Sequence, residues 1–243
     1  MIPQPDSAGE TVVEPRRNDA FWSWVDAAIF VSFMFLSFMV TGGILVALQN
    51  THRVPLATEL VVAQSVLYVL VIGALYLIIV TRYHEPFWRS MGYRRGSGFW
   101  PAWAAGGVVL AVLLAVLGAV IRAPNIPLPF ENLLRGPLAI VSLGFLVVLL
   151  GPFCEELVFR GFFMPLFMRS LGVIPGILLA GVLFGAMHAP EYRYHWQQVA
   201  LVSTAGAVFG WARYRTRSTF PAMAMHAGFN FIQFVLFLAF HNQ

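Results

Sequence analysis

The sequence predicts an all-α fold, a polytopic transmembrane helical bundle with seven or eight spans. Hydrophobic residues make up 59% of the 243 residues and charged residues 11%, whereas soluble domains contain about 45–50% and about 25%. The apolar residues form runs close to the roughly 20 residues that a helix needs to cross the hydrocarbon core. These runs are unbroken rather than alternating, which favours helices over the strands of a β-barrel.

Seven segments have the length and apolar character of membrane spans. They cover residues 21–48, 57–80, 99–121, 137–159, 173–187, 197–214 and 220–240. The segment at 173–187 is short, which indicates that it is not in full contact with lipid. The Pro-rich stretch at 122–137 leaves room for a re-entrant piece, so eight spans are the alternative. Small residues at 104–107 and 205–207 predict close approach between helix backbones.

The chain divides into a polar tail and two groups of helices. Residues 1–20 are too polar to pack and lack the layout of a cleaved signal peptide, so we expect a disordered cytoplasmic tail. Residues 21–136 hold the N-terminal transmembrane helices, and residues 137–243 hold the helical core in which ionisable side chains gather. With the tail inside, ten arginines lie in inside segments and four in outside loops. This asymmetry predicts a cytoplasmic N-terminus.

The charge and the cysteine content exclude a nucleic-acid partner and an internal disulfide. The net charge of +4 is too scattered for a nucleic-acid surface, so we expect no nucleic-acid partner. One cysteine cannot form an internal disulfide.

All the basic residues are arginine and alanine is frequent, which points to a GC-rich bacterial genome and thus to the bacterial inner membrane. The sequence carries no signal for the oligomeric state.

Charged side chains in a span are functional candidates because lipid disfavours them. Glu155, Glu156 and Arg160 lie within or just after the fourth predicted span. Glu156 and Arg160 are four residues apart, so we expect an ion pair on one helix face that fixes the helix. Adjacent helical positions point about 100° apart, which leaves Glu155 without a local partner. Such a carboxylate is a candidate general base.

Two histidines lie in later spans, each with a companion four residues away. Phe184 precedes His188 at the end of the fifth span, and Asn230 follows His226 in the seventh. Each pair shares one helix face. Taken alone, either histidine is more typical of an interhelical hydrogen bond. Together with Glu155, they predict one pocket that holds a base and donors for an oxyanion.

The three motifs, in this order, resemble the signatures of the CPBP family, the CAAX proteases and bacteriocin-processing enzymes, also called Abi. The signatures Glu-Glu-x-x-x-Arg, Phe-x-x-x-His and His-x-x-x-Asn are met by Glu155-Glu156 with Arg160, Phe184 with His188, and His226 with Asn230. The resemblance covers about residues 137–240. The family consists of intramembrane glutamic proteases, similar to the Ras-converting CAAX endopeptidase.

The resemblance implies metal-independent hydrolysis of a peptide bond in a membrane-associated, in some cases prenylated, peptide. By this likeness Glu155 activates water with help from His188. His226 and Asn230 stabilise the oxyanion, and the supporting residues are Glu156, Arg160 and Phe184. Residues 137–243 would then be the catalytic core. The implied partners are membrane lipids and a peptide or protein substrate, and no cofactor is implied.

The residues alone leave other readings open. Glu155, His188 and His226 provide three ligands for Zn²⁺, although the sequence has no His-Glu-x-x-His motif. Cys154 adjoins Glu155, but a free cysteine in an apolar helix is usually inert. A non-catalytic member of the same family, serving in bacteriocin immunity or as a scaffold, and a transporter with a proton path are competing functions. The carboxamide of Asn230 favours an oxyanion pocket over a proton path.

Overall fold

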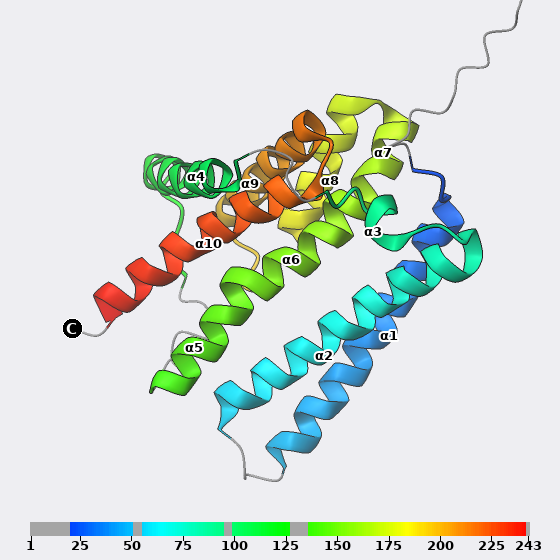
Figure 1. The fold of residues 1–243 in the computed structure, drawn as a ribbon. Helices are drawn as coiled ribbons and strands as arrows, with labels where there is room; N and C mark the ends of the chain where they lie inside the picture. The colour runs from blue at the N-terminus through cyan, green and yellow to red at the C-terminus, as the bar shows by residue number, and fades with distance from the viewer. Residues whose placement is uncertain (1–19, 51–54, 95–98, 127–135, 242–243) are drawn as a thin grey trace, which may run out of the picture.

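The structure is a computed structural model that describes residues 20–50, 55–94, 99–126 and 136–241, and no strand occurs in these ranges (Figure 1). The predicted all-α fold is confirmed. Within the described ranges, five helices are long and apolar enough to cross a membrane, namely Trp24–Gln49, Leu56–Arg82, Trp100–Val120, Pro137–Leu171 and Thr219–Phe240. The chain is therefore an integral membrane protein.

The elements follow one another as helices joined by short connections. The N-terminal group contains α1 (Trp24–Gln49), α2 (Leu56–Leu77), the π-helical turn η1 (Ile78–Arg82), α3 (Phe87–Ser90) and α4 (Trp100–Val120). A long composite helix comes next, made of α5 (Pro137–Phe145), η3 (Leu146–Leu150), α6 (Gly151–Glu156), η4 (Leu157–Phe163) and α7 (Met164–Leu171). The chain ends with α8 (Val173–Met187), α9 (Trp196–Thr216) and α10 (Thr219–His241).

All seven predicted spans are helical, but a count of seven or eight spans is not confirmed. The segment at 173–187 is a shorter apolar helix, as its length predicted, and α9 is not among the five long apolar helices. Residues 1–19 of the predicted tail and residues 127–135 of the predicted re-entrant stretch lie outside the described residues.

The composite helix is longer than the sequence suggested. It runs for 35 residues from Pro137 to Leu171, whereas the predicted span ended at residue 159. Figure 1 shows α5, α6 and α7 following one another in one direction. Arg160 is fully buried rather than at the end of a span, so the charge does not mark the membrane surface. The π-helical turns η3 and η4 flank α6 on both sides, and such turns are frequent at functional sites.

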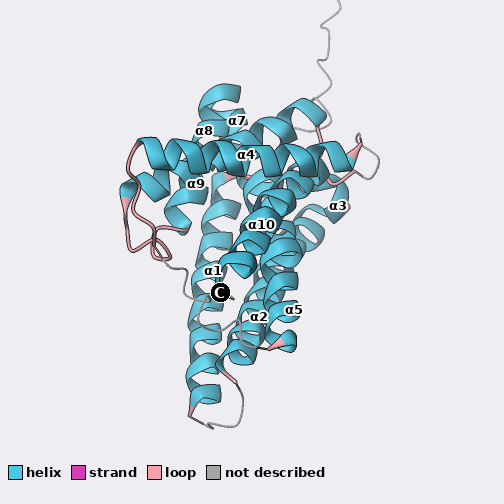
Figure 2. Cartoon of the chain, turned by 90° about the vertical axis from the view of Figure 1, so that its left-hand side faces the viewer, coloured by secondary structure: helices cyan, strands magenta, loops and turns pink. Residues whose placement is uncertain are grey.

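Glycines let pairs of helices touch through their backbones. A Cβ on Gly107 of α4 would lie 1.8 Å from the carbonyl oxygen of Met225, and one on Gly228 of α10 would lie 2.0 Å from that of Ala104. Gly181 of α8 meets the backbone of α9 in the same way, at 2.7 Å. Close approach at the small residues of 104–107 and 205–207 is thereby confirmed. Figure 2 shows α4 lying across α10.

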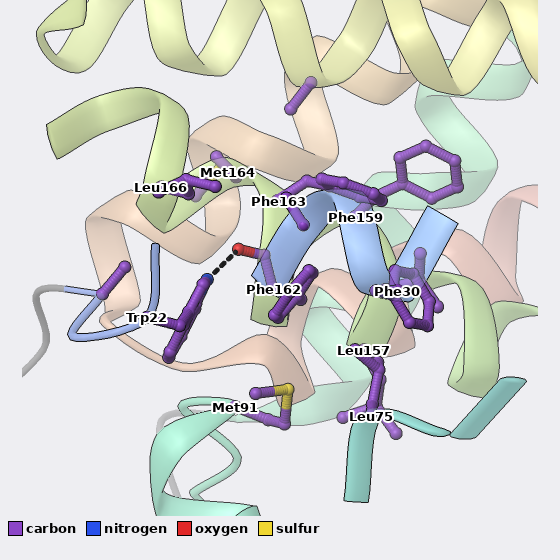
Figure 3. Close-up of a cluster of buried hydrophobic side chains, with 14 of the residues drawn as sticks. Trp22, Phe30, Leu75, Met91, Leu157, Phe159, Phe162, Phe163, Met164 and Leu166 are labelled. Atoms are coloured by element: carbon purple, nitrogen blue, oxygen red, sulfur yellow. Dashed lines mark hydrogen bonds between the residues drawn. The ribbon is translucent and has the colours of Figure 1, made fainter. Parts of the chain in front are cut away.

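The larger hydrophobic core lies where α1 and α2 meet the composite helix (Figure 3). Trp22 is 1% exposed and stacks on Phe162, with ring centroids 5.3 Å apart. Its indole N–H donates to the carbonyl oxygen of Phe162 over 3.2 Å. Phe30 packs edge-on against the same Phe162 ring, and Leu75 and Leu157 are fully buried beside it. These contacts fix η4, which carries Arg160, against the N-terminal helices.

The segment before α1 is also held in place. The guanidinium of Arg169 in α7 donates to the carbonyl oxygens of Ala20 and Trp22. Ala20 is 3% exposed, although the sequence assigned it to the disordered tail. Ala20 therefore belongs to the packed part of the protein rather than to the tail, because Arg169 of α7 supplies a donor for its backbone carbonyl oxygen.

Candidate functional site

Glu156 and Arg160 form a fully buried ion pair. Nη1 of Arg160 donates to Oε1 of Glu156 over 2.9 Å, and both side chains are 0% exposed. Nη2 of Arg160 donates to the carbonyl oxygen of Gly206 in α9 over 2.6 Å. The guanidinium also lies 4.6 Å from the ring centroid of Phe184. The predicted pair is present, and it ties η4 to α9 as well as fixing its own helix.

The same carboxylate orients His226. Nδ1 of His226 lies 3.0 Å from Oε1 of Glu156, and the imidazole stacks on Phe209, with ring centroids 4.7 Å apart. The Glu156 carboxylate accepts hydrogen bonds, so Nδ1 carries the hydrogen. This assignment leaves Nε2 of His226 as the nitrogen that faces the rest of the site.

His188 stands at the C-terminal end of α8. Its Nδ1 lies 2.8 Å from the carbonyl oxygen of Phe184, and the two rings have centroids 4.5 Å apart. The predicted packing of Phe184 against His188 is therefore present. A carbonyl oxygen can only accept, so Nδ1 again carries the hydrogen and Nε2 is free to accept in the neutral ring.

Both Nε2 atoms face Glu155. Its Oε2 lies 3.9 Å from Nε2 of His188 and 3.9 Å from Nε2 of His226. These separations are too long for direct hydrogen bonds but are typical of groups that share one bridging molecule. The side chains of Glu155 and His188 are 23% and 21% exposed, in contrast to the buried Glu156. The structure thus brings α6, α8 and α10 together around one accessible carboxylate.

Tyr68 of α2 is a part of the site that the sequence analysis missed. Its hydroxyl donates to Oε1 of Glu155 over 3.0 Å, which leaves Oε2 directed at the histidines. Gln64 lies one helical turn earlier and interacts with Tyr68. A Cβ on Gly151 would lie 3.1 Å from the Tyr68 hydroxyl, so glycine gives α2 room to approach. Two polar side chains four residues apart in an apolar span are the signal that could have identified Tyr68.

Asn230 is bonded to the backbone of η3. Its Nδ2 donates to the carbonyl oxygen of Val147 over 2.8 Å. In a π-helical turn this carbonyl would accept from the residue five positions later, which is Pro152 and has no N–H. The carboxamide therefore supplies the missing donor, and one of its two N–H groups is used in this way. Asn230 lies on the same helix as His226, one turn further along.

Two other candidate chemistries, a metal site and a reactive Cys154 thiol, can be compared with the geometry. Among the described residues, no group of three or more His, Cys, Asp and Glu side chains is arranged to hold a metal ion. Cys154 is a free, buried thiol that is 4% exposed, as expected for a small apolar side chain.

Comparison with known proteins identifies the segment that carries this site. Residues 137–232 match the model of a family described as type II CAAX prenyl endopeptidase Rce1-like. No curated protein and no solved structure matches the chain. The matched residues run from the start of α5 into α10 and contain all three motifs. The helical core of this membrane protein is therefore similar to the type II CAAX prenyl endopeptidases of the Rce1-like family, which supports the family resemblance that its motifs predicted.

Proposed function

We propose that the chain is an intramembrane endopeptidase of the CAAX-protease type, which hydrolyses a peptide bond of a membrane-associated peptide with a water activated by Glu155. The observation that carries this proposal is the position of Oε2 of Glu155, 3.9 Å from Nε2 of both His188 and His226. Oε2 of Glu155 and Nε2 of a neutral His188 are acceptors, whereas Nε2 of His226 is a donor when that ring is protonated. A water molecule is a donor of two hydrogen bonds, so it is the ligand that suits this space.

The attack on the peptide bond uses this water. Its two hydrogens point to Glu155 and to His188, and its oxygen lone pair is left for the carbonyl carbon of the substrate. As the C–O bond forms, Glu155 takes the water proton as general base, and the carbonyl oxygen becomes an oxyanion. When the tetrahedral intermediate collapses, the C–N bond breaks and Glu155 returns the proton to the leaving amine.

The oxyanion requires donors. Protonated at Nε2, His226 donates from its imidazolium, and Glu156 stabilises the positive charge from the other side of the ring through Nδ1. The second N–H of the Asn230 carboxamide is the proposed companion donor, since the first is bonded to Val147. One such donor contributes about 2.7–4 kcal/mol to transition-state stabilisation.

The proposed substrate is a peptide held at the membrane, with a prenylated peptide as the specific candidate because the matched family is one of CAAX prenyl endopeptidases. The reaction is proposed to need no metal or other cofactor. Membrane lipids and the substrate are the proposed partners, and the proposed location is a bacterial inner membrane with the N-terminus in the cytoplasm.

The test is cleavage by the purified full chain in lipid nanodiscs. Two synthetic peptides of one sequence ending in a CAAX motif, one prenylated and one not, are incubated with the protein, and the products are identified by mass spectrometry. We expect cleavage of the prenylated peptide that persists in EDTA. Cleavage that stops on chelation and returns with zinc would replace the glutamate mechanism by a zinc mechanism at Glu155, His188 and His226. Absence of cleavage of any membrane-tethered peptide would favour an immunity or scaffold role.

Tyr68 is a positioning residue in this account, because it acts through Glu155. Tyr68→Phe removes the hydrogen bond to Oε1 and is expected to lower kcat about tenfold, with KM and the unfolding temperature nearly unchanged. Tyr76→Phe on the same helix, an exposed tyrosine, is the matched control and should behave as the wild type. A kcat for Tyr68→Phe equal to that of the control would remove Tyr68 from the mechanism.

Asn230 is expected to show a double effect. Asn230→Ala leaves the Val147 carbonyl without its donor, which costs about 1–3 kcal/mol of folding free energy, and it also removes the proposed oxyanion donor. Asn230→Ala should therefore lower both the unfolding temperature and kcat. A variant that loses stability but keeps the wild-type kcat would show that Asn230 only bonds η3 and is not an oxyanion donor.

A further inference from the structure

A second buried guanidinium, that of Arg213, is not used by the proposed site. Arg213 lies three residues before the end of α9 and is 5% exposed. Arg160, the other buried arginine of the core, has a carboxylate, a carbonyl oxygen and an aromatic ring as partners. Among the described residues, by contrast, Arg213 makes no ion pair, and its Nε is enclosed without a hydrogen-bond partner.

The surroundings of Arg213 are built to hold the guanidinium rather than to neutralise it. A Cβ on Gly92 would lie 2.2 Å from Nη2 of Arg213, so only a glycine leaves room for the guanidinium here, and its φ of +67° suits glycine. The carbonyl oxygen of Gly92 accepts from the backbone N–H of Thr219 over 3.0 Å. Oγ of Ser218 bonds both backbone groups of Arg94. The turn between α9 and α10 is thus fastened to the linker after α3.

The charges nearby have the same sign as Arg213. The charged group that acts on it is the guanidinium of Arg94, and Arg215 and Arg217 are exposed on the following turn. Oγ1 of Thr219, next to Gly92, is a further enclosed oxygen without a hydrogen-bond partner among the described residues. A buried charge requires a counter-charge or a set of acceptors. Within the described part of the chain, neither is present at Arg213.

We propose that Arg213 binds a phosphate group from outside the chain, with the anionic phospholipid headgroup and free phosphate as its two sources. A guanidinium presents a planar fork of donors that matches phosphate oxygens. The guanidinium lies at a helix end of a membrane bundle, among several arginines. Headgroup phosphates lie at the ends of membrane helices, and basic clusters there bind anionic lipids. Nε of this guanidinium is enclosed and has no hydrogen-bond partner among the described residues, and in this proposal the terminal amino groups meet the phosphate oxygens.

The test compares lipid binding by the wild-type chain and two variants, purified in detergent and stripped of lipid. Native mass spectrometry measures the affinity for phosphatidylglycerol and for phosphatidylcholine of equal chain length, and thermal unfolding is followed with and without inorganic phosphate. Arg213→Met removes the proposed ligand, and Arg215→Met, an exposed arginine two residues further along the same helix, is the matched control.

We expect the wild type to prefer phosphatidylglycerol and Arg213→Met to lose about tenfold or more in that affinity, while Arg215→Met loses about twofold or less. Protection by inorganic phosphate without a preference for phosphatidylglycerol would assign the site to free phosphate. Equal binding of both lipids without protection by phosphate would overturn the proposal, as would wild-type lipid binding by Arg213→Met.

The stability of the lipid-free protein gives an independent outcome. Because Arg213 has no internal partner to lose, Arg213→Met should unfold at the same temperature as the lipid-free wild type or higher, since an apolar side chain replaces an unpaired charge. If Arg213→Met fails to fold, or unfolds at a lower temperature than the lipid-free wild type, the guanidinium has a structural partner and the proposal is wrong.

Discussion

Replacing Glu155 by Gln is expected to lower kcat about a hundred- to ten-thousand-fold, the range that a general base contributes. The substitution keeps the size of the side chain and an oxygen that accepts from Tyr68, but it removes the group that takes the proton of the water. Because Glu155 is partly exposed and is not in the buried ion pair, the fold should survive. The measurement is the rate of peptide cleavage, with unfolding temperature as the check on folding.

Glu191 provides a matched control for the loss of a carboxylate. It follows α8, close enough to Glu155 and His188 for electrostatic interaction with both, and its own side chain is exposed. Glu191→Gln should keep kcat within about threefold of the wild type, because no proton transfer in the proposed mechanism passes through it. A Glu155→Gln variant that cleaves as fast as Glu191→Gln would show that another group is the base.

The largest effect on stability is expected from Arg160→Ala. The substitution leaves the carboxylate of Glu156 in the interior without its cation, and breaking one partner of a buried pair costs about 3–5 kcal/mol. The variant also loses the donor to the Gly206 carbonyl oxygen and the contact with the Phe184 ring. We expect the unfolding temperature in detergent to fall by roughly 10 °C.

A double variant separates the charge from the packing. Arg160→Met combined with Glu156→Gln removes both charges, keeps much of the volume and retains an oxygen that can accept from His226. This variant should recover most of the stability that Arg160→Ala loses, because no buried charge is left uncompensated. An Arg160→Ala protein as stable as the wild type would mean that water or another cation compensates Glu156.

The parts of the site that follow from helical geometry could be predicted from sequence. The spacing of four residues places Glu156 beside Arg160 and Phe184 beside His188, and both contacts are present. Adjacent positions point apart on a helix, which separates Glu155 from the ion pair. Local periodicity thus sufficed for these two pairings, each within one helix.

The contacts between distant segments could not be predicted in this way. Tyr68 is 87 residues from Glu155 in the chain, and nothing in an apolar span fixes which helix it faces. The bond from Asn230 to Val147 depends on the π-helical register of η3, which hydropathy does not reveal. The composite helix extended past residue 159 because the charge of Arg160 is neutralised inside the protein, so a rule that ends spans at charges failed there.

The central claim is that Glu155 and His188 act on the same water, and the most direct test is a double-mutant cycle on single-turnover cleavage. Glu155→Gln and His188→Asn are measured separately and together under identical lipid conditions. If both side chains act on one water, removing either of them already removes most of their joint contribution to the rate. We therefore expect the double variant to be about as slow as the slower single variant. A double variant whose rate loss equals the product of the two single losses would contradict the account, since the two side chains would then act independently.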